Sequence, residues 1–380
     1  MHHNYRVIRL SKSLLRVSKT RYPSFLFGKV RGEDRLPAFI YHDIDSDSFE
    51  QDLKFLIDNE YQSLSTREYV RQKENGLTSH SVLITFDDAR RNFFEKAFPL
   101  IKKYDVHVTL FVPTCWIHPF DSSPDSFFDP SIPPRIFMTW DELRICQESG
   151  LVDIQSHAHR HALVFTSPRV MGFCSPGLLE KCDIYDWPMQ RVNGRNYLGP
   201  PPLGTPIFQS EPLLSASYHM LIDGSITEQC QEYIIKNGGE GFFSDPRWPR
   251  TLHAKLKELI SLDNRSILKN ENIYPLMMDE FSQSESLFQK NLGYKPEYFA
   301  YPWLLGSELS LQCAIKKDIK AAFGVGVDYR RVRRIKEPIS IFGRTKSDWI
   351  RFLPGKGRKT LREVVPGKFK KFLRSQHLAH

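Results

Sequence analysis

The pattern that most constrains this chain is an alternation of short apolar strands with amphipathic helices, which begins at residue 37. Residues 81–86 and 106–112 are apolar runs of strand length, and helical patterns over 90–104 and 139–150 follow them. Strands that are apolar on both faces are typical of parallel sheets with helices on each side. The alternation therefore predicts an α/β fold whose parallel sheet is either open or closed into a barrel.

The alternation stops between about residues 163 and 270 and then resumes with a helical pattern over 277–293 and a strand over 296–302. The intervening stretch is rich in proline, glycine and aromatic residues. It is too long for an ordinary connection between a strand and a helix, because most such connections have fewer than about ten residues. We expect an ordered but irregular insertion there.

The net charge of +9 is concentrated at the two ends of the 380-residue chain. Residues 1–35 carry nine Lys and Arg against two acidic residues, and residues 351–380 carry nine against one. Such ends serve either solubility or contact with an anionic surface such as a membrane, and no nucleic-acid partner is expected. Arg9, Lys12 and Arg16 interrupt every apolar run near the N-terminus, so neither a secretory signal nor a membrane span is expected.

The six cysteines are scattered along the chain without a C-x-x-C pair. This spacing argues against a disulfide framework and against a thiolate zinc site, and it favours a reducing compartment. Together with the N-terminal pattern, it predicts a cytoplasmic protein that is peripheral at the inner membrane face if its basic ends bind lipid.

Polar residues stand where four of the predicted strands end. In parallel α/β folds the carboxyl ends of the strands meet at one rim, and the chemistry is found there. We therefore expect these side chains to form one site. They are His42, the pair Asp87 and Asp88, the pair His157 and His161, and Tyr301.

The acidic pair and the histidine cluster suggest a metal site. At the end of a strand, one carboxylate of Asp87 and Asp88 can bind a metal while the other reaches an adjacent water; the alternative is a helix N-cap beside a solvated acid. Neutral imidazoles and a carboxylate form a three-ligand catalytic set with an open position. The spacing alone leaves open whether His157 pairs with His159 or with His161.

Five segments in order resemble the motifs of the polysaccharide deacetylases, carbohydrate esterase family four. The resemblance is closest to the branch that deacetylates poly-N-acetylglucosamine, and it covers residues 37–161 and 276–345. The segments are FIYHDI (39–44), LITFDD (83–88), FPLIKKYDVHVTLFV (98–112), TWDELRICQESGLVDIQSHAHRH (139–161) and YFAYP (298–302).

The resemblance implies a deformed (β/α) barrel, here with a long irregular insertion, and a divalent metal, Zn²⁺ with Co²⁺ or Ni²⁺ as alternatives. By position in the motifs, Asp88, His157 and His161 are similar to the metal ligands. Asp87 matches the general base and His42 the general acid, and Tyr301 falls where the family shapes the oxyanion site. The expected domains are a basic segment (1–35), a catalytic domain (36–350) with the insertion, and a basic tail (351–380).

The implied reaction removes N-acetyl groups from an amino sugar or glycan, including a lipid-linked or nucleotide-linked precursor. Two departures from the family pattern bear on this: Ala89 stands where glycine is common, and the motif around Tyr301 lacks the arginine that orients the base. Arg344 is a candidate replacement, and Arg90 is another, although a surface cation is the favoured interpretation for Arg90.

Trp303 and Arg344 are candidate substrate contacts. Two other functions compete with the deacetylase interpretation. One is an amidohydrolase-like metallohydrolase that uses His157 and His159, and the other is a non-catalytic carbohydrate-binding or assembly protein on a deacetylase scaffold.

Overall fold

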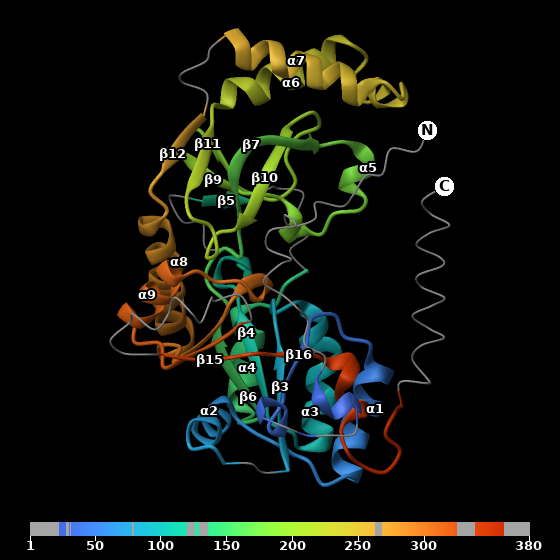
Figure 1. The fold of residues 1–380 in the computed structure, drawn as a ribbon, viewed down its shortest axis with the longest axis vertical. Helices are drawn as coiled ribbons and strands as arrows, with labels where there is room; N and C mark the ends of the chain where they lie inside the picture. Colours follow the sequence, from blue (N-terminus) through green and yellow to red (C-terminus); the bar gives the residue numbers. More distant parts are fainter. Residues whose placement is uncertain are drawn as a thin grey trace.

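The computed structural model describes residues 23–27, 30, 32–77, 80–119, 126–128, 136–262, 268–324 and 339–360. Most of both basic ends lies outside these ranges. Figure 1 shows two stacked parts: a barrel of strands surrounded by helices, and above it a second part built mainly from the predicted insertion.

The barrel is a parallel sheet with the strand order β15-β14-β13-β6-β4-β3-β1-β16. Only Gly343 and Arg344 separate β15 from β16, so this one segment pairs first with β14 and then with β1. The segment thereby closes the sheet into a ring, and the predicted deformed (β/α) barrel is confirmed. The strands are β1 (Ala38–Tyr41), β3 (Ser81–Phe86), β4 (Val108–Val112), β6 (Val152–Ser156), β13 (Tyr298–Ala300), β14 (Ala321–Phe323), β15 (Ser340–Phe342) and β16 (Thr345–Lys346), and β2 (Gln62–Ser63) pairs with the start of β3.

Helices cover the outside of the barrel. They are α1 (Ser46–Asp58), α2 (Thr66–Glu74), α3 (Phe98–Tyr104), α4 (Trp140–Glu148), α8 (Tyr274–Leu292) and α9 (Glu308–Lys316). Thr139 caps α4 with a capping box, in which its side chain accepts the N–H of Glu142. Asp45 caps α1, because its carboxylate accepts the N–H of Ser48, two residues inside the helix. Among the described helices, none is both long enough and apolar enough to cross a membrane.

The predicted helix over 90–104 is divided into a π-helical turn (Phe93–Ala97) and α3. Ala97 and Phe98 keep right-handed helical backbone angles, so the two parts form one continuous helical segment with Pro99 inside it. The N–H of Phe98 donates to the carbonyl of Phe93, five residues earlier, so the hydrogen bonding departs from the α-helical pattern directly before the proline, which has no N–H to donate.

The two-residue period of the strands decides which side chains enter the barrel. In β3, Val82, Ile84 and Phe86 pack outward in the core beneath α1, α3 and α4. Leu83 belongs instead to the interior core, together with residues of β4 and β13. Thr85, two residues further on, continues along this interior face, so the chain reaches Asp87 with its side chain on the barrel side.

The predicted insertion is more regular than the sequence suggests. A long antiparallel ladder joins β7 (Leu163–Phe173) to β10 (Pro206–Pro212), and a shorter one joins β11 (His219–Ile222) to β12 (Leu268–Glu271). The remaining elements of the insertion are α5 (Pro176–Leu179), β8 (Gln190–Val192), β9 (Arg195–Leu198), α6 (Gly224–Lys236) and α7 (Trp248–Leu262). One strand that precedes the insertion in the sequence, β5 (Ser126–Phe128), pairs with β9. Helices α6 and α7 lie at the end of the molecule farthest from α1 and α2 (Figure 1).

This second part has a hydrophobic core of its own, in which side chains of β7, β10, α6 and α7 meet. Its members include Phe165, Phe208, Cys230 and Leu252. The insertion therefore stabilises itself by apolar burial and does not depend only on contacts with the barrel.

The insertion core can be tested at one buried position on α7. Leu252 is fully buried, so Leu252→Ala should lower the free energy of unfolding by about 2–5 kcal/mol. Ile235 on α6 is 72% exposed, and the matched change Ile235→Ala should alter it by less than about 0.5 kcal/mol. Urea unfolding followed by circular dichroism measures both; equal effects would contradict the described core.

Candidate metal centre

Four of the predicted site residues follow directly after a barrel strand. His42 comes after β1, Asp87 after β3, His157 after β6 and Tyr301 after β13. These strands are parallel and lie in one ring, so their carboxyl ends share one rim. The structure thus brings residues that are up to 259 positions apart in the sequence to the same end of the barrel.

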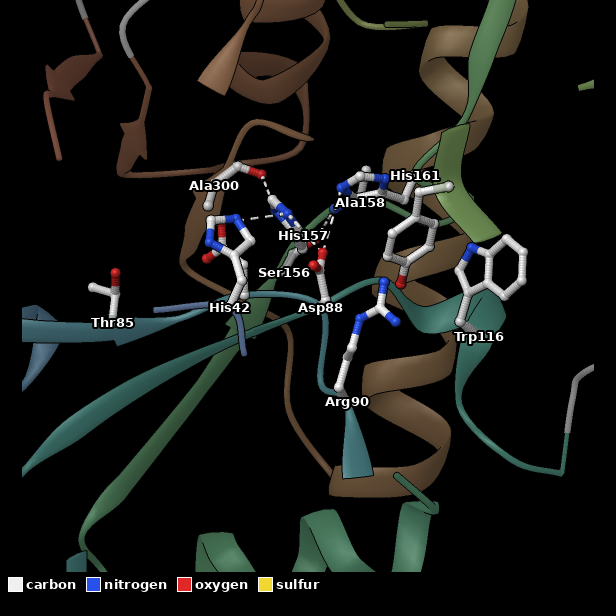
Figure 2. Close-up of polar contacts among 12 residues, drawn as sticks. His42, Thr85, Asp88, Arg90, Trp116, Ser156, His157, Ala158, His161 and Ala300 are labelled. Atoms are coloured by element: carbon white, nitrogen blue, oxygen red, sulfur yellow. Dashed lines mark hydrogen bonds and ion pairs between the residues drawn. The ribbon is translucent and has the colours of Figure 1, made fainter. Parts of the chain in front are cut away.

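Asp88, His157 and His161 form a compact group of buried side chains at this rim, and their ligand atoms all lie within 4.8 Å of one another. The Oδ1 atom of Asp88 is 3.6 Å from Nε2 of His157 and 3.4 Å from Nε2 of His161. Figure 2 shows the carboxylate of Asp88 between the two imidazoles. Two ligand atoms that each lie about 2.1 Å from one tetrahedral zinc ion are about 3.4 Å apart, so the spacing suits such an ion.

Left-handed backbone conformations bring the ligands together. Asp88 has a φ of 72° and Ala89 a φ of 47°, which end the extended path of β3 and turn the Asp88 carboxylate toward the histidines. Glycine is the usual residue in this region of φ, so Ala89, which stands where the family commonly has glycine, adopts this conformation at some cost in backbone strain. Ala158 and His161 have φ values of 68° and 49°, so the histidine segment also turns sharply.

The protonation states also suit a cation. The Nδ1 atom of His157 donates to the carbonyl of Ala300 at 2.8 Å, which leaves Nε2 as the lone-pair nitrogen facing Asp88. Burial lowers the pKa of His157 to about 4 and that of His161 well below its ordinary value, so both rings are neutral at neutral pH. Neutral imidazole is the form that binds zinc.

Asp88 is a buried carboxylate whose surroundings favour binding of a cation. It is 5% exposed, and its Oδ1 atom has no hydrogen-bond partner among the described residues. Burial, followed by the neighbouring Asp87 carboxylate, raises the pKa of Asp88 to about 8. A carboxylate oxygen without a hydrogen-bond partner, placed between two neutral imidazoles, fits a divalent metal ion. Such an ion would offset the repulsion between the Asp87 and Asp88 carboxylates and would give Oδ1 of Asp88 a contact.

Asp87 has the opposite electrostatic environment. Its two carboxylate oxygens accept hydrogen bonds from Nη1 and Nη2 of Arg344 at 2.6 and 2.8 Å, and Nη1 also donates to Thr85 at 3.2 Å. Burial alone would raise the pKa of Asp87, but Arg344 and then His157 outweigh it and lower the pKa to about 2. Asp87 is therefore ionised at every physiological pH.

Arg344 thus orients the predicted base, which was one of its two proposed roles. Its side chain is fully buried and both terminal nitrogens are engaged with Asp87, so it is not positioned to contact a substrate. Arg90 is not a surface cation: it forms an ion pair with Asp183 of the insertion at 2.5 Å, and its guanidinium lies over the ring of Tyr185. Both corrections depend on contacts between residues that are far apart in the sequence.

His42 lies at the edge of the group. Its Nε2 atom is 4.0 Å from Oδ2 of Asp87, and its side chain is 55% exposed. Of the predicted site residues that surround the metal position, it is the one that reaches solvent. This placement suits a group that exchanges protons with a substrate entering from outside.

Tyr301 does not join the group. Because β13 alternates like the other strands, Tyr301 shares the outward face of Phe299, and its fully buried ring packs against the residues of α9. Its N–H donates to the carbonyl of Phe323 at 2.9 Å, so a donor for an oxyanion has to come from another group. Trp303, two residues on, does reach the site, and its ring lies 4.1 Å from that of His161.

His159 is not part of the metal group, whose ligand atoms come from Asp88, His157 and His161. Its Nδ1 atom shares a 2.9 Å hydrogen bond with the hydroxyl of Thr114, and the ring is buried on that side of the loop. The arrangement therefore favours His157 with His161, four residues apart, over the H-x-H pair.

Sequence reasoning missed two contributors to the site. Tyr185 of the insertion stacks on His161, with ring centroids 4.0 Å apart. Glu280 of α8 accepts hydrogen bonds from the backbone of the histidine segment. No local motif marks either residue, because each acts only through a partner that is distant in the sequence.

Comparison with known proteins agrees with this geometry. The family model described as polysaccharide deacetylase matches residues 74–171, a region that contains Asp87, Asp88, His157 and His161. Residues 74–171 belong to the polysaccharide deacetylase family. The motif resemblance seen in the sequence is thereby confirmed.

Named relatives of this chain include YxkH of Bacillus subtilis (strain 168), which is 31% identical over 111 residues, or 27% of this chain and 40% of that protein. The poly-beta-1,6-N-acetyl-D-glucosamine N-deacetylase of Staphylococcus epidermidis is 27% identical over 161 residues, or 39% of this chain and 52% of that protein. The chain thus spans about half the length of these curated relatives or less. Among solved structures, the BpsB deacetylase domain of Bordetella bronchiseptica aligns with a TM-score of 0.49 at 14% identity, over 83% of this chain and 97% of that one.

The ligand assignment in this deacetylase region can be tested by zinc binding. His161→Ala removes one of three ligands and should weaken zinc binding by at least about 100-fold, since the remaining pair cannot complete a catalytic set. His159→Ala should leave the affinity within about threefold. Competition with a chromogenic chelator measures both; zinc loss in His159→Ala alone would instead favour the H-x-H pair.

The pair formed by Asp87 and Arg344 can be tested by a double-mutant cycle. Arg344→Met leaves a buried carboxylate without its partner and should cost about 3–5 kcal/mol of stability. Adding Asp87→Asn removes that charge, so the double variant should be more stable than Arg344→Met alone. Urea unfolding of the four proteins gives the coupling free energy, and simple additivity would contradict the described pair.

Proposed function

We propose that this protein is a metal-dependent hydrolase that removes N-acetyl groups from an amino sugar or glycan. The observation that carries the proposal is the convergence of three metal-ligand side chains with a second, ionised carboxylate beside them. Oδ2 of Asp87 is 3.5 Å from Nε2 of His157, so the base stands next to the position that the three ligands surround. A metal with three protein ligands and an open position is the arrangement of catalytic rather than structural sites.

Zinc held by Asp88, His157 and His161 would supply a Lewis acid that polarises the acyl oxygen and makes water acidic enough to be deprotonated near neutral pH. Asp87 is suited to accept the proton of the attacking water, because Arg344 keeps it ionised and fixes the direction of its carboxylate. The oxygen of that water forms a bond to the carbonyl carbon, and the bond from carbon to nitrogen then breaks.

The nitrogen must gain a proton before it leaves as an amine. His42 is the group proposed to donate it, since its ring stands 4.0 Å from Asp87 and is open to solvent. The same position lets the ring recover a proton from solvent after each turnover. The products are acetate and a free amino group on the sugar.

An N-acetylated glucosamine unit is the proposed substrate class. The name of the Staphylococcus epidermidis relative specifies poly-beta-1,6-N-acetyl-D-glucosamine, and the segment that matches the polysaccharide deacetylase model carries Asp87, Asp88, His157 and His161. Trp303, which is partly exposed beside His161, offers an aromatic face on which a sugar ring can stack. The predicted cytoplasmic location, contact with an anionic membrane and absence of a nucleic-acid partner stay predictions.

The proposal is tested by acetate release from β-1,6-linked and β-1,4-linked N-acetylglucosamine oligomers. Zinc-loaded protein should release acetate, chelation should abolish the release, and added Zn²⁺, Co²⁺ or Ni²⁺ should restore it. Asp87→Asn keeps the shape of the side chain but removes the base, so kcat should fall by about 10²–10⁴ while zinc stays bound.

The matched control is Asp153→Asn, which changes a carboxylate near the opposite end of β6 and should leave kcat unchanged. Protein that binds zinc and the oligomers but releases no acetate under any of these metals would contradict the proposal. That outcome would favour the non-catalytic carbohydrate-binding alternative.

A further inference from the structure

The segment that carries the two histidine ligands needs support from outside itself. It leaves β6 at Ser156 and passes through left-handed conformations at Ala158 and His161. Residues other than glycine adopt such conformations only when the surrounding structure holds them there. Two imidazoles on so short a turn stay aimed at one point only if the turn itself is fixed.

Glu280, on α8, contacts the middle of this turn. Its side chain is 1% exposed, and its Oε2 atom accepts hydrogen bonds from the backbone N–H of His159 at 3.0 Å and of Arg160 at 2.7 Å. Its other oxygen, Oε1, accepts from Nη1 of Arg160 at 2.7 Å. One carboxylate thus binds two consecutive N–H groups that lie between the two metal ligands.

A second contact from the same helix face supports the start of the turn. The hydroxyl of Ser284, one helical turn after Glu280, lies 2.8 Å from that of Ser156. The Ser156 hydroxyl also accepts the N–H of Ala158 at 3.2 Å. Helix α8 therefore holds the turn at two points about one helical turn apart.

We propose that Glu280 is a positioning residue of the metal centre, which fixes the turn between the two histidine ligands through its backbone N–H groups and so sets the affinity for the divalent metal. This inference rests on the metal site of the proposed function. Groups that orient metal ligands without touching the metal typically contribute 10-fold to 100-fold to metal affinity.

The ion pair with Arg160 has a separate task. Arg160 is fully buried and donates to Glu280 and, at 2.5 Å, to Asp279. Its positive charge therefore stabilises the ionised carboxylate of Glu280, which burial alone would disfavour. A buried ion pair can be replaced by uncharged side chains of similar size without loss of the fold. The backbone acceptor and the charge can therefore be separated by mutation.

Two double variants make this separation. Arg160→Met with Glu280→Gln removes both charges but keeps an amide oxygen that can accept the two backbone N–H groups. Arg160→Met with Glu280→Met differs only in lacking that acceptor at nearly the same volume. The Gln variant should bind zinc within about threefold of the unchanged protein, whereas the Met variant should bind it 10-fold to 100-fold more weakly.

Zinc dissociation constants from chelator competition give the first readout on the full chain. The second is the rise in the unfolding midpoint on adding zinc, which depends on metal affinity and should shrink only in the Met variant. A merely structural role would lower the midpoint of the metal-free protein and leave that zinc-dependent rise unchanged. Equal zinc affinity in the two double variants, or equal weakening in both, overturns the proposal.

If the Met variant does not fold, Glu280→Asp provides the test, because it keeps the charge but withdraws the carboxylate from the turn by one methylene. Its zinc affinity should fall at least about fivefold, and unchanged affinity overturns the proposal. Failure of the unchanged protein to release acetate while these zinc affinities behave as expected would remove the deacetylase function and leave the positioning role intact.

Discussion

Two adjacent carboxylates buried at the end of β3 are the constraint on which the rest of the site depends. Asp87 and Asp88 are 3% and 5% exposed, and burying one ionised carboxylate already costs several kcal/mol. The structure treats the two differently. Arg344 compensates Asp87 with two hydrogen bonds, whereas Asp88 faces imidazoles that burial keeps neutral. Asp87 is therefore held ionised and oriented, whereas Asp88 is buried beside neutral rings, as the proposed base and the proposed metal ligand require.

The compensation of Asp87 is built into the closure of the barrel. Arg344 is one of only two residues between β15 and β16, the segment that joins the two ends of the sheet. From there its guanidinium enters the barrel, lies over the ring of Phe111 and reaches Thr85 and Asp87 on β3. Because the barrel interior is closely packed, a shift of the closing segment would also move the base. The segment that closes the ring therefore also orients the carboxylate of Asp87.

The elements that could be predicted from the sequence are those determined by interactions between residues close together in the chain. Apolar runs and caps located the strands and helices of the barrel, and strand ends located His42, Asp87 and His157. Arg344 was one of two candidates for the arginine that orients Asp87, but only its contact across 257 positions of the chain decides between it and Arg90. Glu280 could not be found from the sequence, because it acts on a residue 120 positions away and nothing in its local sequence separates it from other Glu residues. Tyr301 was misplaced for a related reason: the motif fixes its position in the chain, but the strand period turns its side chain outward.

In the sequence, the insertion lies between the two halves of the site. The histidine turn precedes it, whereas α8 and the Ala300 carbonyl that bind the turn follow it. The contact between Glu280 and Arg160 closes a loop across 120 positions of the chain, and the entropy cost of closing such a loop grows only slowly with its length. The insertion also returns to the site: Tyr185 stacks on His161, and Asp183 pairs with Arg90, two residues beyond Asp88. Any ion bound by Asp88 and His161 would therefore stabilise the insertion together with the barrel, and an unfolded insertion would remove the stacking partner of His161 and the ion-pair partner of Arg90.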